Sequence, residues 1–245
     1  YSYPGSGDTT VVHLSRSLLV SQKGELGRGL KGADVRFSVN GEAVSLAWTD
    51  DSIPGVPAQS YYAVKTYEDG DKVNITAAAE GMKAVSSATV VPSRFPLTSI
   101  NFVLKGGEPN QLQFWIHFTD NAQTKDYYAL KVERKRQFWN DSEYSVENSS
   151  LTLNLDDEPL LNTSSGLDDI LMIENEFYRN LYYWDDTKIQ GKSYKVRLNT
   201  NYEADYEDDF ITPDGVEHIK CQVKYRISLY SLSEEFYRYL KSLND

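Results

Sequence analysis

Residues 35–48 decide the fold class, and they read Val-Arg-Phe-Ser-Val-Asn-Gly-Glu-Ala-Val-Ser-Leu-Ala-Trp. Apolar residues occupy every second position from Val35 to Val39 and again from Val44 to Trp48, on either side of Asn40-Gly41. This period of two places the apolar side chains on one face of a β-strand. Because both residues of an Asn-Gly pair accept the positive φ of a tight turn, the stretch predicts a β-hairpin with one buried face.

The same period of two recurs along most of the chain, and glycine turns such as Asp69-Gly70 and Glu80-Gly81 separate the segments. The further strands predicted in this way are Val73–Ala77, Leu112–Phe118, Tyr127–Val132, Leu151–Leu155, Tyr194–Leu198 and Cys221–Leu229. Many short alternating strands without intervening helices are typical of sandwiches. The sequence therefore predicts an all-β fold with two β-sandwich-like domains and a short C-terminal helix.

Helix signals are concentrated at the C-terminus. Ser231 is predicted to cap the first turn, with Glu234 completing a capping box. An apolar stripe at helical spacing follows at Phe236, Tyr239, Leu240 and Leu243. The segment Leu167–Trp184 is ambiguous, because its first part has helical spacing whereas Tyr182-Tyr183-Trp184 is typical of a strand.

A domain boundary is predicted where Pro92 and Pro96 bracket a short break, since proline cannot donate to a β-ladder. Residues 1–95 are predicted to form an N-terminal immunoglobulin-like β-sandwich domain. Residues 96–245 are predicted to form a C-terminal β-rich domain that ends in the helix.

Composition narrows the possible partners. The chain has 245 residues with 36 acidic and 25 basic side chains, a formal net charge of −11. This charge disfavours nucleic acid, whose phosphates it would repel. The single cysteine, Cys221, excludes an intrachain disulfide, and its place on an apolar strand face predicts a buried, inert thiol. The start at Tyr1 rather than Met indicates a longer precursor, and no apolar run is long enough to span a bilayer.

Residues that carry catalysis are not arranged in any pattern that we can assign. His13, His117 and His218 lie on separate predicted strands without metal-ligand spacing. Paired acids are abundant, but sequence cannot select two of 36 as a catalytic pair. We therefore predict a non-enzymatic protein without cofactor or metal; a hydrolase with unrecognised carboxylates is the third alternative.

Two acidic and aromatic segments, Tyr182–Asp186 and Tyr202–Phe210, are the candidate contact surface, because exposed aromatic side chains often anchor a partner. The residues proposed for binding are Tyr182, Tyr183, Trp184, Tyr202, Tyr206 and Phe210. Two alternatives stay open: the aromatic rings turn inward and fill the second core, or the acidic loops hold a cation such as calcium.

The order of several motifs resembles one family over nearly the whole chain. The stretches are Leu30–Phe37, Tyr67–Ile75, Trp184–Tyr194 and, most distinctively, Leu229–Leu240. Together they are similar to the Bacteroidota outer-membrane lipoprotein family known as domain of unknown function 4249. The resemblance implies an exported, lipid-anchored protein at the outer membrane or cell surface, although the lipid-bearing cysteine is absent from this chain.

The resemblance also implies a role. Members are often encoded beside TonB-dependent transporters, so we expect an accessory binding protein that serves a transporter in nutrient capture, with the transporter or a surface protein or polymer as partner. The alternative is a structural or adhesive envelope module that binds glycan or protein. In such envelopes O-glycosylation occurs at an Asp-Ser/Thr pair before a small or apolar residue, and Asp8-Thr9 and Asp51-Ser52 fit this pattern.

Overall fold

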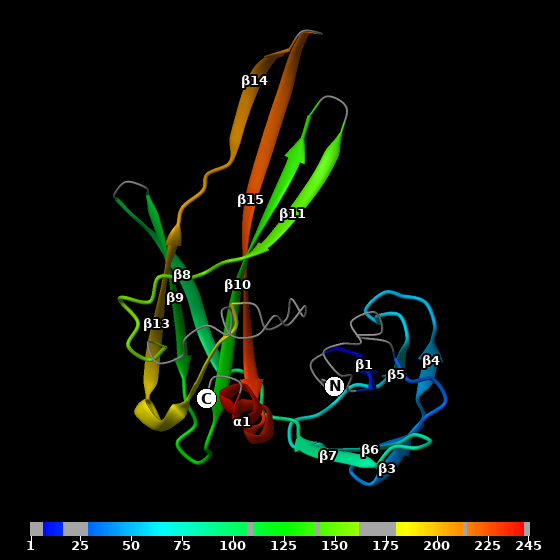
Figure 1. The fold of residues 1–245 in the computed structure, drawn as a ribbon. Coiled ribbons are helices and arrows are strands. Elements are labelled where there is room, and N and C mark those ends of the chain that lie inside the picture. Colours follow the sequence, from blue (N-terminus) through cyan, green and yellow to red (C-terminus); the bar gives the residue numbers. More distant parts are fainter. Residues whose placement is uncertain are drawn as a thin grey trace. The chain divides into compact units, whose positions relative to one another are not determined.

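The computed structural model describes residues 7–16, 29–106, 110–140, 143–161, 180–212 and 215–242. The chain is an all-β protein with one short C-terminal helix in its described part (Figure 1). It divides into two compact units, Tyr1–Ser93 and Arg94–Asp245, so that the division falls inside the stretch between Pro92 and Pro96. No described helix has the length and apolar character needed to cross a bilayer.

The N-terminal unit consists of two antiparallel sheets. The first has the order β1-β5-β4, with bounds Thr9–Val12, Ser60–Val64 and Ala47–Thr49. The second has the order β3-β2-β6-β7, with bounds Glu42–Val44, Asp34–Val39, Lys72–Ala78 and Val85–Val90. Its core contains buried residues of both sheets, namely Val12, Phe37, Val39, Tyr61 and Val73. This arrangement is the β-sandwich that the alternation predicted.

The hairpin at Asn40-Gly41 is confirmed, with φ values of 53° and 86°. The strand predicted from Val44 to Trp48 is wrong, because β3 ends at Val44 and β4 begins at Ala47 in the other sheet. The chain crosses between the sheets here, so the continuous alternation belongs to two strands. Trp48 then packs edge-on against Tyr61, with 4.8 Å between ring centroids.

The C-terminal unit also has two sheets. One has the order β13-β9-β8, with bounds Ser193–Asn201, Gln111–Thr119 and Leu97–Lys105. The other has the order β11-β10-β15-β14, with bounds Tyr144–Ser150, Tyr127–Trp139, Gly215–Leu232 and Tyr206–Thr212. Strand β12 (Tyr182–Asp185) pairs with the first half of β10, the short 3-10 helix η2 spans Asp186–Lys188, and α1 spans Glu234–Ser242.

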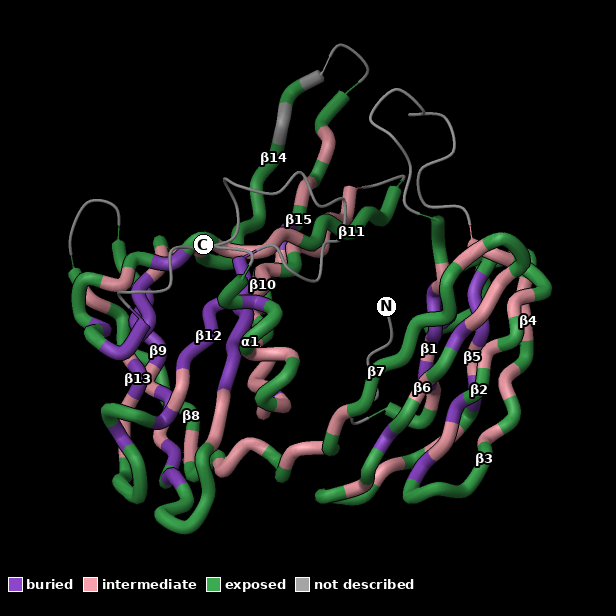
Figure 2. The backbone as a smooth tube through the Cα atoms, turned by 60° about the horizontal axis from the view of Figure 1, so that its bottom comes forward, coloured by how far each residue is buried: buried purple, intermediate pink, exposed green. Residues whose placement is uncertain are grey.

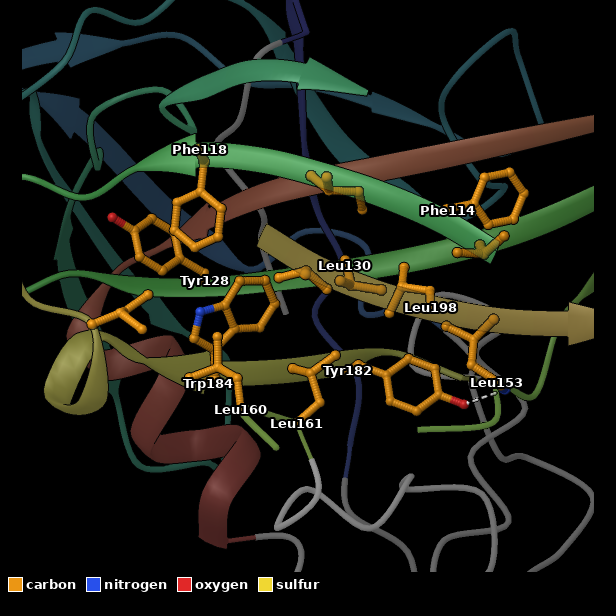
Figure 3. Packing of buried hydrophobic residues seen from close by; sticks show 14 of the residues in the cluster. Phe114, Phe118, Tyr128, Leu130, Leu153, Leu160, Leu161, Tyr182, Trp184 and Leu198 are labelled. Atoms are coloured by element: carbon orange, nitrogen blue, oxygen red, sulfur yellow. Dashed lines mark hydrogen bonds between the residues drawn. The ribbon is translucent and has the colours of Figure 1, made fainter. Parts of the chain in front are cut away.

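The core of the C-terminal unit lies between these two sheets, where aromatic rings and branched aliphatic side chains interdigitate (Figure 3). Phe114 and Ile116 of β9 are buried, and Leu130 of β10 is fully enclosed. Cys221 is also buried, as predicted, and burial raises the pKa of its thiol. Ile227 of β15 is half-buried and packs against the cluster.

Two predicted elements are displaced. The prediction of a strand at Leu151–Leu155 is wrong. The observed strand, β11, ends at Ser150, and beyond it Asn154 makes only a single bridge to Asn199. Residues 167–179 of the ambiguous segment lie outside the described residues, whereas its end, β12, is the strand that the aromatic run indicated.

The cap of α1 is Ser233 rather than Ser231. Strand β15 continues to Leu232, which pairs with Tyr127, so Ser231 is still part of the sheet. The hydroxyl of Ser233 then accepts the backbone N–H of Phe236 at 3.3 Å. Of the predicted apolar stripe, Leu240 is buried and Tyr239 is exposed, while Leu243 lies outside the described residues.

Candidate functional site

The candidate contact surface of the C-terminal unit lies where strands β10 and β15 extend beyond the core. Strand β15 has 18 residues and β10 has 13. At roughly 3.3 Å per residue, β15 extends about 60 Å. The structure accordingly shows the β10–β11 and β14–β15 hairpins projecting from the body of the sandwich (Figure 1). We call the projecting part, residues 133–150 and 206–224, the arm.

The arm is exposed, whereas the first half of β10 is not (Figure 2). Tyr128–Val132 are buried in succession, and every described residue of β10 from Glu133 onward is half-buried or exposed. Most of β11 and the tip of β15 are exposed as well. Apart from Cys221, which is buried at its base, the described part of the arm is half-buried or exposed, a form that is suited to contact with another molecule.

The strand register places four of the exposed apolar side chains of the arm, Tyr144, Val146, Ile211 and Val216, on one face. Tyr144 lies opposite Trp139, Val146 opposite Gln137, and Ile211 opposite Val216. Directly opposed residues of antiparallel strands share a face, and Trp139 joins the β11 residues to β15 through its pairing with Lys220. We call this the outer face of the arm. The side chains of Ile211, Val216 and Tyr144 are 91%, 55% and 54% exposed.

Polar and charged groups occupy the middle of the outer face. The rings of Trp139 and Tyr144 lie 5.3 Å apart, and the amide of Gln137 donates to the Tyr144 hydroxyl at 2.7 Å. Next to them His218 and Asp209 form a pair, as do Lys220 and Glu207. A shallow depression of about 460 Å³ opens between these groups. Its residues are Trp139, Asn140, Glu207, Asp208, Asp209, His218, Ile219 and Lys220. Such a broad, shallow surface fits a macromolecule better than it fits a small ligand.

An ion cluster fixes the base of the arm on its opposite face. The carboxylate of Glu203 accepts from Arg134 at 2.7 Å and from Arg136 at 2.7 and 2.8 Å. Arg136 also bonds Glu147 of β11, so that the cluster ties β10 to its neighbours on both sides. The hydrogen bond from Arg136 lowers the pKa of Glu203 below its usual value. The backbone N–H of Glu203 in turn donates to the Tyr225 hydroxyl at 3.1 Å.

The first predicted contact segment lies in the core, so its assignment as a contact surface is wrong. Tyr182, Tyr183 and Trp184 are 4%, 7% and 4% exposed. Strand β12 is enclosed because Tyr182 and Trp184 face the core cluster (Figure 3), whereas Tyr183 faces the helix and donates to the carbonyl of Leu240 at 3.3 Å. The alternative that these rings turn inward is the one observed.

The second predicted segment is divided. Tyr202 is half-buried and packs against the core cluster. Tyr206 is 42% exposed and lies on β14, on the face of the arm opposite to the outer face, next to Cys221. The backbone of Phe210, in β14, pairs with that of Glu217 in β15, and the side chain of Phe210 lies outside the described residues. Sequence reasoning therefore found one exposed tyrosine on the arm and missed Trp139, Tyr144, Val146, Ile211 and Val216. The sequence feature that could have indicated these residues is an alternation of apolar and polar positions in strands that are longer than a sandwich core can cover.

Three acidic side chains form the one group in the described part of the chain that could hold a cation. Oxygen atoms of Asp120, Asp126 and Asp186 lie within 4.8 Å of one another. Carboxylate oxygens are ligands that calcium and magnesium prefer. Burial raises the pKa of Asp126, and its carboxylate accepts from Thr124 at 2.6 Å.

The same carboxylates already have protein donors. Asp120 accepts from the Tyr128 hydroxyl and the backbone N–H of Gly191, both at 2.7 Å. Asp186 forms an ion pair with Lys125 and accepts the backbone N–H of Asp126 at 2.7 Å. These contacts join the β9–β10 loop to η2 and the turn after it, which gives the cluster a structural role in closing this end of the sandwich.

The predicted glycosylation positions lie in the N-terminal unit. Ser52 is exposed and its hydroxyl donates to the carbonyl of Val56 at 3.4 Å. Thr9 is half-buried at the start of β1, and its hydroxyl donates to Asp8 at 3.0 Å. Modification of either residue stays a prediction.

A family model described as Domain of unknown function (DUF4249) matches residues 1–245, the whole chain. No curated protein sequence matches it.

Proposed function

Because the chain belongs to the family described as Domain of unknown function (DUF4249), we propose that it is a non-enzymatic lipoprotein of the bacterial envelope. It acts at the outer membrane or cell surface as an accessory binding protein for a TonB-dependent transporter. In this role the arm contacts the transporter, or a protein that the transporter serves, and the sandwich body holds the arm in position.

The observation that carries this proposal is the outer face of the arm. Tyr144, Val146, Ile211 and Val216 are exposed on one face of the arm, on the side of its sheet that faces away from the β13-β9-β8 sheet. Exposed apolar and aromatic side chains on one surface are costly in water and mark sites of protein association. The ion cluster at Glu203 supports the same role, since a fixed base presents the arm in one orientation.

The test is co-purification from native membranes. The lipid-anchored protein, carrying an affinity tag at its C-terminus, is compared with a variant in which Tyr144→Ser and Val146→Ser remove apolar side chains from the outer face. The matched control is Val85→Ser with Val90→Ser, since these valines are 58% and 44% exposed on β7 of the other unit. We expect the wild type and the control to retain a TonB-dependent transporter, identified by mass spectrometry, and the arm variant to lose it.

Two results would contradict the proposal. In the first, the transporter is retained at the wild-type level by the arm variant, which would remove the outer face as the contact. In the second, wild-type protein yields no transporter after mild crosslinking in intact cells, which would exclude the accessory role itself.

A further inference from the structure

A second surface of the C-terminal unit lies on the sheet β13-β9-β8, on the side that faces away from the core. Because opposed residues share a face, the register places nine outward side chains in three rows across the strands. The rows are Ser99, His117 and Lys195; Asn101, Trp115 and Arg197; and Val103, Gln113 and Asn199. We call the first two rows the basic face.

The basic face differs in charge from the protein as a whole. Its six side chains include Lys195, Arg197 and His117 and contain no acid, whereas the chain carries a net charge of −11. Among the described residues the guanidinium of Arg197 has no carboxylate within ion-pair distance. This surface is therefore a local positive site on an acidic protein, which favours a ligand that carries anionic groups.

An aromatic ring lies in the middle of the basic face and is held in place. The ammonium group of Lys195 lies 4.3 Å from the ring centroid of Trp115, a cation–π contact. The indole N–H of Trp115 donates to Gln113 at 2.6 Å, and the amide of Gln113 donates to Asn199 at 2.8 Å. Trp115 is half-buried, so part of the ring stays open to solvent.

The third row closes one end of this surface. The carboxylate of Asp157 accepts from Lys105 at 2.6 Å and from Gln113 and Asn199 at 3.0 Å each. These donors lower the pKa of Asp157, with the Lys105 bond as the largest cause. Asp157 therefore stays ionised, and its charge is offset by its ion pair with Lys105 rather than by Lys195 or Arg197.

From this juxtaposition we propose that the basic face binds an acidic polysaccharide, a chain of sugar rings that carry carboxylates. One pyranose ring packs its C–H groups against the indole of Trp115, whose ring face is electron-rich. Lys195 and Arg197 bind carboxylates of that sugar or the next one, and Asn101 and Ser99 bond hydroxyl groups. The ammonium of Lys195 moves from the ring face to the carboxylate, which opens that face for stacking.

The geometry favours a polysaccharide over other polyanions. The face is an open strip two rows long, which suits a few successive sugars, and its hydroxyl and amide groups match sugar hydroxyls. This proposal does not rest on the transporter proposal, because the arm belongs to the other sheet.

The experiment is isothermal titration of the full chain with polygalacturonate oligomers at low salt, with neutral pullulan oligomers of the same length as reference. We expect Trp115→Ala to weaken binding about tenfold, equivalent to about 1.4 kcal/mol, and Trp115→Phe to weaken it about threefold. The double variant Lys195→Ala with Arg197→Ala should weaken binding about tenfold and reduce its salt dependence. Thermal melting of each variant checks that it is folded.

The matched control removes two lysines from the arm. Lys135 and Lys224 are exposed and directly opposite each other on β10 and β15. Their replacement by alanine changes the net charge by the same amount as the Lys195 and Arg197 variant, and we expect binding to stay within about twofold of wild type.

Three results would overturn the proposal. Wild-type protein that binds pullulan as well as polygalacturonate would show that charge has no part in recognition. An equal loss in the arm control would reduce the effect to general charge. Binding to phosphatidylglycerol vesicles, with loss on Trp115→Ala and without binding to polygalacturonate, would assign the face to lipid phosphate.

Discussion

Strands β10 and β15 each contain two regions that share a sequence pattern and differ in structure. Near α1 the strands are covered by the opposing sheet, and Leu130 and Val132 are fully buried. Beyond Glu133 the same strands form the arm, where Lys135 and Val216 are exposed (Figure 2). The register stays continuous through the change, from Tyr127 opposite Leu232 to Trp139 opposite Lys220. Pairing within a sheet and cover over a sheet are thus separate properties.

This difference indicates where stability and binding reside. Burial of apolar surface is the main favourable term in folding, so the covered region should hold most of the stability of the C-terminal unit. The arm contributes backbone pairing but little apolar burial. Substitutions in the covered region should therefore change stability, and substitutions in the arm should change partner binding. The loss in free energy of unfolding should be largest in the covered region and smallest in the arm.

The largest effect is expected for Trp184→Ala, in the middle of the covered region. The ring of Trp184 packs against Tyr128 at 5.6 Å and Phe118 at 6.3 Å between centroids. Removal of a buried tryptophan leaves a large cavity and should lower the free energy of unfolding by about 3–5 kcal/mol. Urea unfolding followed by circular dichroism measures it.

A conservative variant separates the packing of Trp184 from its polar atom. Its indole N–H is buried without a hydrogen-bond partner among the described residues. Trp184→Phe removes this group and keeps an aromatic ring, so it should cost clearly less than the alanine variant. If Trp184→Ala changed stability by less than about 1 kcal/mol, the assignment of this residue to the core would be wrong.

The second effect concerns Glu158, a fully buried carboxylate at the border of the covered region. It accepts from the Tyr194 hydroxyl at 2.8 Å, and from the backbone N–H groups of Arg197 at 2.7 Å and Leu160 at 3.0 Å. Glu158→Gln directs an amide donor at one of these donors, and we expect a loss of about 2–3 kcal/mol. The measurement is the same unfolding titration, with exposed Glu235→Gln as control.

If Glu158→Gln left stability unchanged, the edge of β13 would not depend on this carboxylate. Exchange of the Arg197 amide hydrogen with solvent would then be fast in wild-type protein as well, and NMR can measure this rate. Slow exchange in the wild type and fast exchange in the variant is the expected pair of results.

The fold could be predicted from the sequence wherever local pattern and tertiary cover agree. The hairpin at Asn40-Gly41 follows from the backbone needs of two residues, and the burial of Ile116 follows from alternation in a strand that lies inside its sheet. Prediction failed where the deciding partner is distant. Alternation cannot show that the chain changes sheets after Val44, or that Ser231 is held in β15 by its pairing with Tyr128.

The candidate site shows the same limit more strongly. Tyr182–Trp184 and Tyr144 are both aromatic positions in strands, and nothing local distinguishes a ring that meets the opposing sheet from one that meets water. Glu158 has no motif either, since two of its three donors lie more than thirty residues along the chain. Residues of this kind are identified by contacts that only the folded chain creates.

The third effect concerns the base of the arm and depends on pH. The pKa of Glu203 is lowered in the folded protein, chiefly by its bond to Arg136, and its side chain is 25% exposed. Because folding lowers this pKa, Glu203 contributes its full stability at pH values above the pKa of the unfolded chain, near 4.5. This contribution is lost as the pH falls through the pKa of the folded protein. Glu203→Gln should therefore cost about 1.5 kcal/mol at about pH 7, and the difference from wild type should shrink as pH falls below about 4.5. Unfolding titrations at several pH values measure it, and a difference that is independent of pH would show that the charge of Glu203 is not what fixes the arm.

The smallest effect on stability is expected at the outer face of the arm, and it makes the comparison sharpest. Tyr144→Ser and Ile211→Ser replace side chains that are 54% and 91% exposed. Because neither ring nor branched chain is enclosed by protein, each substitution should change the free energy of unfolding by no more than about 0.5 kcal/mol. Tyr144→Ser has the larger expected value of the two, because its ring contacts Trp139 and its hydroxyl accepts from Gln137. The same unfolding titration gives both values, and transporter retention in the co-purification assay gives the corresponding loss of binding. A loss of more than about 2 kcal/mol in either variant would mean that the arm packs against another part of the chain in solution, and then it would be a structural element rather than a contact surface.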